Sequence, residues 1–334
     1  MTTYIKKSEP AREEDDKQVR DLVGEILAKV KKEGDSALYY YEKKFDDYEP
    51  ENIRVSKDEM AAAKGKLPLE VIEELDFAIS QVTKFAEAQR GCLSDLELDI
   101  LPGLTMGHRV LPVESCACYV PAGRYPCLTS AVMSVIPAKV AGVSRIVVAC
   151  PPGRDKAINP GILYTLDQMG VKEIYCMGGA QAIGAFAFGT ETTKPVNLIV
   201  GPGNQWVQEA KRQVFGTCGL DFLAGPSEVM VIADASARAD FIAADLLAQC
   251  EHDPNARGSF VTTSRTLAEA VVLEVEKQLK VLKTEDVARK SWETKGEVVL
   301  FDTLEECAAY ANSYAPEHLE VHTKVPADLL NHLT

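Results

Sequence analysis

The chain has 334 residues, of which 46% are hydrophobic, and a formal net charge of −14 with a pI near 5.0. That length supports a sizeable core in about two domains, and the acidic balance argues against nucleic acid or an anionic membrane as a partner. No apolar run is long enough to span a bilayer, and residues 1–16 lack the apolar stretch of a signal peptide.

The first third of the chain predicts helices. Apolar residues at helical spacing predict a helix over 17–32, a shorter one over 39–45 and a long one over 68–90. We expect the inward face of the long helix to consist of Val71, Ile72, Leu75, Ile79, Val82 and Phe85. Short β-like runs follow at 96–101 and 117–120.

From Tyr119 onward the sequence alternates between strand and helix patterns. Strands are predicted at 145–149, 173–177, 198–200, 229–233, 259–262 and 298–301. Helices are predicted between them at 181–188, 206–214, 237–251 and 267–279. This alternation is typical of parallel α/β layers with right-handed crossovers.

Glycine-rich loops follow two of these strands and precede a third. They lie at 178–181, 201–204 and 224–228, and a further one is 121–123. Glycines let backbone N–H groups approach a phosphate, and ligands of open α/β sheets bind beyond the carboxyl ends of strands. Plain tight turns are the alternative, because no G-x-G-x-x-G fingerprint is present.

Two further places carry polar side chains suited to chemistry. Gln249 and His252 lie three residues apart where a helix ends before Pro254, so they could hold a divalent cation or merely cap the last carbonyls. Glu317 and His318 stand together just before a strand. An imidazole can take a proton from an alcohol and a carboxylate can activate water, although a solvated loop pair is the alternative.

The nine cysteines show no C-x-x-C pair, and the closest two are Cys116 and Cys118. This pattern is typical of free thiols in a reducing compartment. We therefore expect a cytoplasmic protein.

Six ordered motifs across the chain resemble the histidinol dehydrogenase family. They are Tyr-Val-Pro-Ala-Gly at 119–123, Gly-Gly-Ala-Gln-Ala at 178–182, Gly-Pro-Gly-Asn at 201–204, Ala-Gly-Pro-Ser-Glu at 224–228, Gln-Cys-Glu-His at 249–252 and Pro-Glu-His-Leu at 316–319. The resemblance implies a zinc-dependent, NAD-linked enzyme that oxidises a primary alcohol through an aldehyde to a carboxylate in one site.

The resemblance also implies roles for individual residues. Gln249 and His252 would be zinc ligands and would contact the substrate, Glu317 would activate water, and His318 would be the general base and contact the substrate. Ser227 would bind the substrate as well. The NAD site would be lined by Tyr119, Gln181 and Asn204.

The family fold implies two incomplete Rossmann-like α/β domains, the second inserted in the first, with an N-terminal helical arm and a homodimeric assembly. We expect residues 1–15 to form the arm, and 16–118 with 228–334 to form the first domain with the metal and catalytic residues. Residues 119–227 would form the inserted NAD-binding domain.

The sequence departs from the family pattern in two ways. Asp253 stands where the family usually has glycine, and the metal-binding aspartate and histidine of the family's C-terminal part are absent from these residues. We therefore expect a C-terminally shortened chain that binds zinc weakly by itself.

Two other functions stay open at this point. Residues 107–109 and 130–134 resemble a branch that oxidises 2,3-dihydroxypropane-1-sulfonate (sulfopropanediol), for which Arg109 or Arg124 could pair with the sulfonate, whereas Ser227 matches the histidinol branch. A non-catalytic nucleotide-binding fragment is the alternative of another class.

Overall fold

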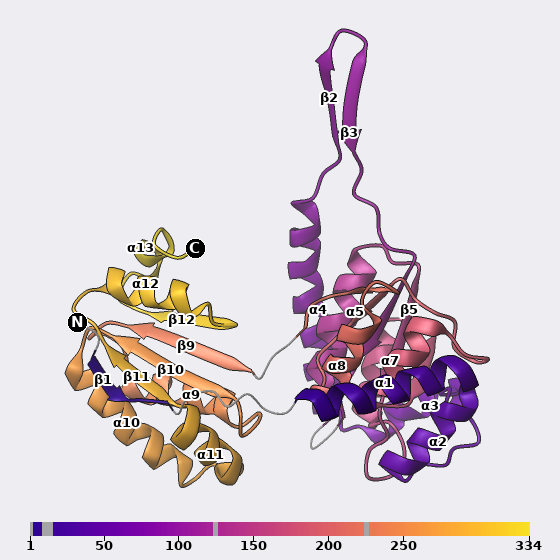
Figure 1. Cartoon of the computed structure of the whole chain (residues 1–334), viewed down its shortest axis with the longest axis horizontal. Helices are drawn as coiled ribbons and strands as arrows, with labels where there is room; N and C mark the ends of the chain where they lie inside the picture. Colours follow the sequence, from indigo (N-terminus) through magenta and orange to yellow (C-terminus); the bar gives the residue numbers. More distant parts are fainter. Residues whose placement is uncertain (1–2, 9–15, 123–125, 224–226) are drawn as a thin grey trace. The chain divides into compact units, whose positions relative to one another are not determined.

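The computed structural model describes residues 3–8, 16–122, 126–223 and 227–334 (Figure 1). The chain divides into two compact units. One comprises Glu14–Ala224, and the other combines Met1–Glu13 with Gly225–Thr334. Each unit is built around its own sheet, and each is described by itself.

The Glu14–Ala224 unit contains a five-stranded parallel sheet with the order β6-β5-β4-β7-β8. Its strands are β4 (Ser115–Tyr119), β5 (Arg145–Cys150), β6 (Glu173–Cys176), β7 (Leu198–Val200) and β8 (Gly219–Leu220). The central strand β4 is buried along its whole length. Its run of small and apolar residues suits a parallel strand that is covered on both faces.

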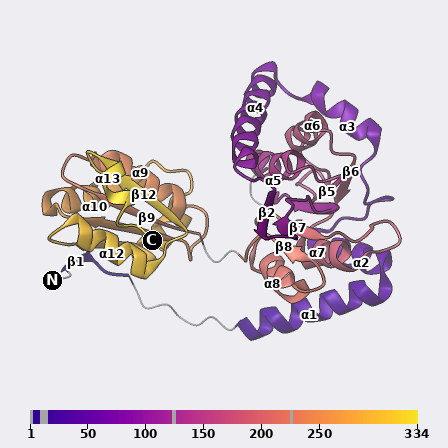
Figure 2. The same cartoon turned by 90° about the horizontal axis from the view of Figure 1, so that it is seen from above.

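Helices cover both faces of this sheet, as Figure 2 shows. One face packs against α1 (Asp16–Glu33), α2 (Asp35–Asp46), α7 (Gly179–Phe188) and α8 (Gln205–Val214). The other packs against α3 (Lys57–Ala63), the 3₁₀ turn η1 (Lys64–Lys66), α4 (Leu69–Gly91), α5 (Leu128–Val140) and α6 (Pro160–Gln168). The sheet thus lies between two helical layers, with one hydrophobic cluster on each of its faces.

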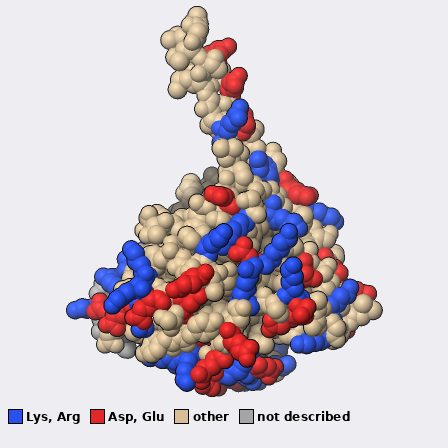
Figure 3. Space-filling view, turned by 90° about the vertical axis from the view of Figure 1, so that its right-hand side faces the viewer, with Lys and Arg blue, Asp and Glu red and all other residues tan. Residues whose placement is uncertain are grey.

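A two-stranded antiparallel hairpin extends beyond the end of α4 (Figure 1). Its strands are β2 (Leu96–Leu101) and β3 (Leu104–His108), and every residue in them is exposed. Lys and Arg mix with Asp and Glu over the face drawn in Figure 3, while the tip of the hairpin carries no charge. This chain therefore leaves the hairpin without a covering layer within the described residues.

The second sheet has the order β1-β11-β10-β9-β12, in which only β1 is antiparallel. Its strands are β1 (Thr3–Lys6), β9 (Glu228–Ala233), β10 (Arg257–Thr262), β11 (Glu297–Leu300) and β12 (His318–His322). One face packs against α9 (Ala239–Cys250), α10 (Arg265–Leu279) and α11 (Glu285–Lys295). The other packs against α12 (Leu304–Tyr314) and α13 (Pro326–Leu330).

The mixed α/β architecture confirms the predicted parallel α/β layers. The predicted strands and helices end within two residues of the observed ones, except that the helix predicted over 39–45 begins four residues earlier, at Asp35. The described residues include all nine cysteines, and none of them forms a disulfide. Among the described residues, no helix combines the length and apolarity needed to cross a membrane.

Three expectations need correction. Residues 3–6 form strand β1 rather than part of a helical arm, because Thr3, Tyr4 and Lys6 pair with β11.

The two units also differ from the predicted domains, which grouped 16–118 with 228–334. Helices α1–α4 pack on the sheet of β4–β8, so they belong with it. Finally, Phe85 is 66% exposed, because Ala86 takes the inward position of that turn of α4.

Candidate functional site

A cavity of about 550 Å³ lies in the Glu14–Ala224 unit. Its lining includes the three residues expected to bind NAD, Tyr119, Gln181 and Asn204, together with Asp46 and Trp206. Cavities that hold small molecules and cofactors usually measure about 300–1,000 Å³. The structure therefore gathers the three predicted residues around a space of suitable size.

The cavity lies at the carboxyl edge of the sheet, where the strand order reverses. The chain runs from β4 outward through β5 to β6 and then returns to the other side of β4 as β7. Tyr119 ends β4 and the loop with Asn204 follows β7. The reversal leaves a crevice between β4 and β7, which is the usual ligand position in doubly wound sheets.

Two glycines allow the loops to approach one another here. Gly201 has φ +114°, and a Cβ at this position would lie 2.3 Å from the carbonyl oxygen of Tyr119. Gly179 has φ +62°, and a Cβ there would lie 2.7 Å from Oε1 of Gln181. Both loops therefore need glycine for conformation, and Gly201 needs it for space as well, because its neighbour is backbone.

The N-terminus of α7 is held by two side chains from distant parts of the sequence. The N–H of Gly179 donates to the hydroxyl of Tyr119 (3.1 Å), and the N–H of Gly178 donates to Oε1 of Glu42 (3.1 Å). Nε2 of Gln181 donates to the same Oε1 (3.0 Å). Burial raises the pKa of Tyr119 well above its ordinary value and that of Glu42 to about 7.

Asn204 is the N-cap of α8, since its Oδ1 accepts from the N–H groups of Trp206 and Val207 (3.1 Å each). This capping leaves the amide nitrogen of Asn204 for a ligand. The loop before it is fixed by Lys211, which is fully buried and donates to the carbonyl of Gly201 (3.0 Å) while pairing with Asp221. Sequence reasoning missed this buried pair.

The predicted catalytic residues lie in the other unit, at the amino edge of its sheet. His318 is opposite Val229 in the parallel pairing of β12 with β9, and Ser227 precedes β9 directly. Nε2 of His318 lies 3.8 Å from Oε1 of Glu317. Ser227, Glu317 and His318 are therefore neighbours along one edge.

Two carboxylates brace this edge. Oε2 of Glu317 accepts from the N–H of Glu228 (3.4 Å), and Oε1 of Glu228 accepts from the N–H of Glu317 (3.3 Å). The reciprocal contacts join the starts of β9 and β12 and orient the carboxylate of Glu317. Sequence reasoning missed the bracing role of Glu228, although its place beside Ser227 was noted.

Gln249 and His252 lie where α9 ends. Gln249 is in the last turn, and the N–H of His252, two residues beyond the helix, donates to the carbonyl of Gln249 (3.2 Å). Because α9 connects the parallel strands β9 and β10, it runs back across the sheet and ends near the start of β10. The two predicted zinc ligands thus lie toward the same amino edge as Glu317 and His318, and not at the carboxyl edge.

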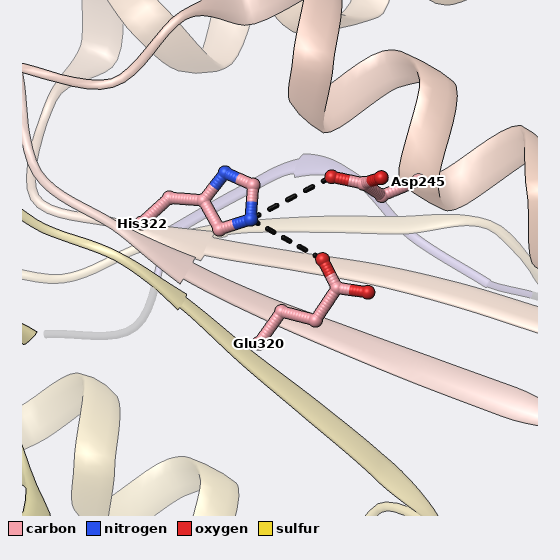
Figure 4. A group of neighbouring side chains, drawn as sticks. All are labelled: Asp245, Glu320 and His322. Carbon is pink, nitrogen blue, oxygen red and sulfur yellow. Dashed lines mark hydrogen bonds and ion pairs between the residues drawn. The ribbon is translucent and has the colours of Figure 1, made fainter. Parts of the chain in front are cut away.

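A further cluster on the α9 side of β12 was missed by sequence reasoning (Figure 4). Nε2 of His322 lies 3.2 Å from Oε2 of Glu320 and 3.6 Å from Oδ2 of Asp245 in α9. Burial and the neighbouring Asp245 raise the pKa of Glu320. The available signal was alternation, because residues 318, 320 and 322 share one face of a strand.

Some residues singled out from the sequence belong neither to the cavity nor to the group at the amino edge of the second sheet. Gly123, Arg124 and residues 224–226 lie outside the described residues, and Arg109 is an exposed residue directly after the hairpin. Tyr119, Gln181 and Asn204 belong to one unit, while Ser227, Gln249, His252, Glu317 and His318 belong to the other.

Comparisons with known proteins agree with one another. The sequence pattern of the histidinol dehydrogenase family matches residues 9–334. A histidinol dehydrogenase homolog from Shouchella clausii is 42% identical over 336 residues, which cover 100% of this chain and 79% of that protein. The histidinol dehydrogenase of Methanocaldococcus jannaschii is 42% identical over 94% of this chain and 72% of its own length.

A solved structure gives the same result. The crystal structure of histidinol dehydrogenase from Elizabethkingia anophelis superposes with a TM-score of 0.92 at 36% identity, covering 98% of this chain and 75% of that one. The ordered motifs, the two α/β units and the matches along nearly the whole chain lead to one conclusion: the chain belongs to the histidinol dehydrogenase family.

Proposed function

We propose that this enzyme oxidises L-histidinol through the aldehyde to L-histidine and reduces NAD in each of the two oxidations. The observation that carries the proposal is the cavity lined by Tyr119, Gln181 and Asn204 at the carboxyl edge of a doubly wound sheet. NAD is the ligand that this position and these polar groups suit best. The family membership supplies the substrate.

In the first oxidation, His318 takes the hydroxyl proton of the alcohol, and NAD, if bound, would accept the hydrogen of the same carbon as hydride. The imidazole is 58% exposed, so an alcohol can reach it, and the carboxylate of Glu317 at 3.8 Å stabilises the imidazolium that forms. The products are the aldehyde, NADH and one proton on His318.

In the second oxidation, Glu317 takes a proton from water, and the hydroxide adds to the aldehyde. The N–H of Glu228 holds one oxygen of the Glu317 carboxylate (3.4 Å), so the other oxygen is the one free to accept that proton. A second NAD would accept the hydride of the hydrated aldehyde, and the carboxylic acid that results releases its proton to solvent and becomes the carboxylate.

Gln249 and His252 fit the zinc that the family implies. They offer an amide oxygen and an imidazole nitrogen from one turn at the negative end of α9, and no protein hydrogen bond to either side chain occurs within the described ranges. Zinc bound there would supply a fixed positive charge for the amino or hydroxyl group of the substrate. Ser227 would hold another part of the same molecule.

The two halves of the chain suit a revised domain assignment. We propose Glu14–Ala224 as the NAD-binding domain and the remaining unit as the catalytic and metal-binding domain. The orders β6-β5-β4-β7 and β11-β10-β9-β12 are alike. In each, the strand that comes first in the sequence, β4 or β9, lies between the second and the last strand of its series. This likeness supports the description as two incomplete Rossmann-like domains. The nine cysteines, which show no C-x-x-C pair, support a cytoplasmic location.

We also propose a homodimer in which the hairpin β2–β3 packs against a second copy. Leu98 lies opposite Met106, so the two share a face with Leu96 and Ile100, while Glu97 and Asp99 point to the other side. These apolar residues are 48–58% exposed. A face of this kind needs a covering surface, and the same face on a second copy is self-complementary about a twofold axis.

The function is tested with the full-length gene product, zinc and NAD by following NADH formation. L-Histidinol should be oxidised, and 2,3-dihydroxypropane-1-sulfonate should give a kcat/KM lower by about two orders of magnitude or more, since the relatives carry the histidinol dehydrogenase name. Faster oxidation of the sulfonate would mean that the sulfonate, and not L-histidinol, is the substrate, and the proposed two-step oxidation would still hold. NADH formation with neither alcohol would favour a nucleotide-binding protein without this activity.

A further inference from the structure

A cluster outside the residues assigned to catalysis brings three metal-binding side chains together. It consists of Asp245 on α9 with Glu320 and His322 on β12 (Figure 4). Each residue contributes one ligand atom, and these atoms all lie within 4.8 Å of one another. His322 ends β12, whereas His318, the proposed base, begins it. The cluster therefore lies apart from the catalytic edge of the same sheet.

The distances in the cluster match those between the ligands of one metal ion. Nε2 of His322 lies 3.2 Å from Oε2 of Glu320 and 3.6 Å from Oδ2 of Asp245. Ligand atoms that surround zinc at about 2.1 Å are roughly 3.0–3.4 Å apart, whether the angle between them is octahedral or tetrahedral. An ion in front of Nε2 would therefore reach all three side chains after small side-chain rotations.

Hydrogen bonding alone leaves this cluster poorly satisfied. Both carboxylates approach the same ring nitrogen of His322, and that nitrogen carries at most one hydrogen, which can point at one oxygen. Neither carboxylate forms an ion pair with a lysine or an arginine of the described residues. Burial and the charge of Asp245 raise the pKa of Glu320, since the two carboxylates repel each other. A divalent cation would attract both carboxylates and bind the lone pair of a neutral imidazole at the same time.

The cluster is partly open to solvent and connects two elements that the catalytic residues use. The side chains are 26% exposed at His322, 37% at Asp245 and 39% at Glu320, so water can complete the coordination of an ion. Gln249 lies one turn beyond Asp245 on α9, and His318 begins β12. An ion here would hold the helix of a proposed zinc ligand to the strand of the proposed base.

We propose that Asp245, Glu320 and His322 form a second zinc site, separate from Gln249 and His252, that links α9 to β12. The ion binds Nε2 of the imidazole and one oxygen of each carboxylate, and water fills its remaining position. An imidazole with two carboxylates suits zinc better than magnesium or calcium, which prefer ligand sets made of oxygen.

The test counts zinc per chain by elemental analysis of the full-length gene product after zinc loading and dialysis. Wild-type protein should retain two zinc ions, one at each site. His322→Ala should retain one, His252→Ala should also retain one, and the double variant should retain none, because each substitution removes a ligand of a different ion. The matched control is His332→Ala, an exposed histidine of the same unit, which should retain two.

A second variant guards against an effect of His322→Ala on folding. Glu320→Ala should also lose one zinc ion while circular dichroism shows a folded protein, and added zinc should raise the unfolding temperature of this variant less than that of wild type. Two zinc ions retained in both variants would overturn the inference.

The pattern of loss separates this site from the proposed catalytic zinc. A single zinc ion in wild type that is lost in His252→Ala and kept in His322→Ala would overturn the inference and leave the catalytic zinc in place. A single ion with the opposite pattern would support this site and remove the catalytic one. Wild-type protein without zinc would overturn both.

Discussion

The buried carboxyl of Glu42 makes the stability of the Glu14–Ala224 unit depend on pH in a way that one substitution removes. Burial raises its pKa to about 7, and the hydrogen bonds from Gln181 and Gly178 offset only part of that effect. An unfolded glutamate titrates near pH 4.5. Between these values the folded chain holds a proton that the unfolded chain releases, so its stability falls as the pH rises.

The magnitude follows from the two pKa values. Because one pKa unit corresponds to about 1.4 kcal/mol, the wild-type protein should lose about 3 kcal/mol relative to Glu42→Gln between pH 4.5 and 7. Above pH 7 both states are ionised, and the difference should stay constant. The variant carries no titrating group at this position, so contributions from Asp46 and other carboxyls largely cancel in the comparison.

The assay is urea unfolding of both proteins from pH 4.5 to 8, followed by tryptophan fluorescence. Trp206 lies in the same unit as Glu42 and Trp292 in the other, so a Trp292→Phe background assigns the transition to the Glu14–Ala224 unit. Glu73→Gln, on the surface of α4, serves as the control. A difference between wild type and Glu42→Gln that stays within about 0.5 kcal/mol over the whole range would refute the burial argument.

The remaining predictions concern the two sites and the hairpin. His318→Asn should lower kcat by roughly two to four orders of magnitude, whereas an unchanged rate would remove the assigned base. Glu317→Gln should slow oxidation of the aldehyde more than that of the alcohol in stopped-flow traces, since only the second oxidation consumes water; equal slowing would contradict the division of roles. Asn204→Ser keeps an N-cap oxygen for α8 but loses the amide nitrogen, so the KM for NAD should rise about tenfold with a smaller change in kcat; an unchanged KM would move the cofactor elsewhere. Leu98→Asp should shift the protein from dimer to monomer in sedimentation equilibrium while Glu97→Lys on the opposite face should not, and a dimer in both would exclude the hairpin face.

Local pattern was enough to predict most of the strands and helices. The apolar run at Arg145–Cys150 and the stripe of α1 bury their residues as expected, because covered parallel strands and amphipathic helices carry their periodicity in adjacent residues. The grouping of these elements was less predictable. Strand β1 pairs with β11 almost 300 residues away, and nothing in Thr3–Lys6 specifies that partner.

The sites show the same limit. Glycine loops identified Gln181 and Asn204, because a strand, a glycine turn and a helix start leave a local signature. Glu42 on α2 accepts a hydrogen bond from Gln181, 139 residues later in the sequence, so only the packing of α2 against α7 reveals this contact. The contact of Asp245 with His322 likewise depends on α9 lying beside β12. Glu317 and His318, by contrast, were expected just before a strand, and they lie at the start of β12.

The most direct test is the number of NADH molecules formed per L-histidinol by the full-length gene product with zinc. We expect two NADH for each histidinol consumed, with L-histidine as the product, and loss of both in the presence of a zinc chelator. A single NADH with accumulating aldehyde, or no NADH at all, would contradict the two-step oxidation proposed for this enzyme.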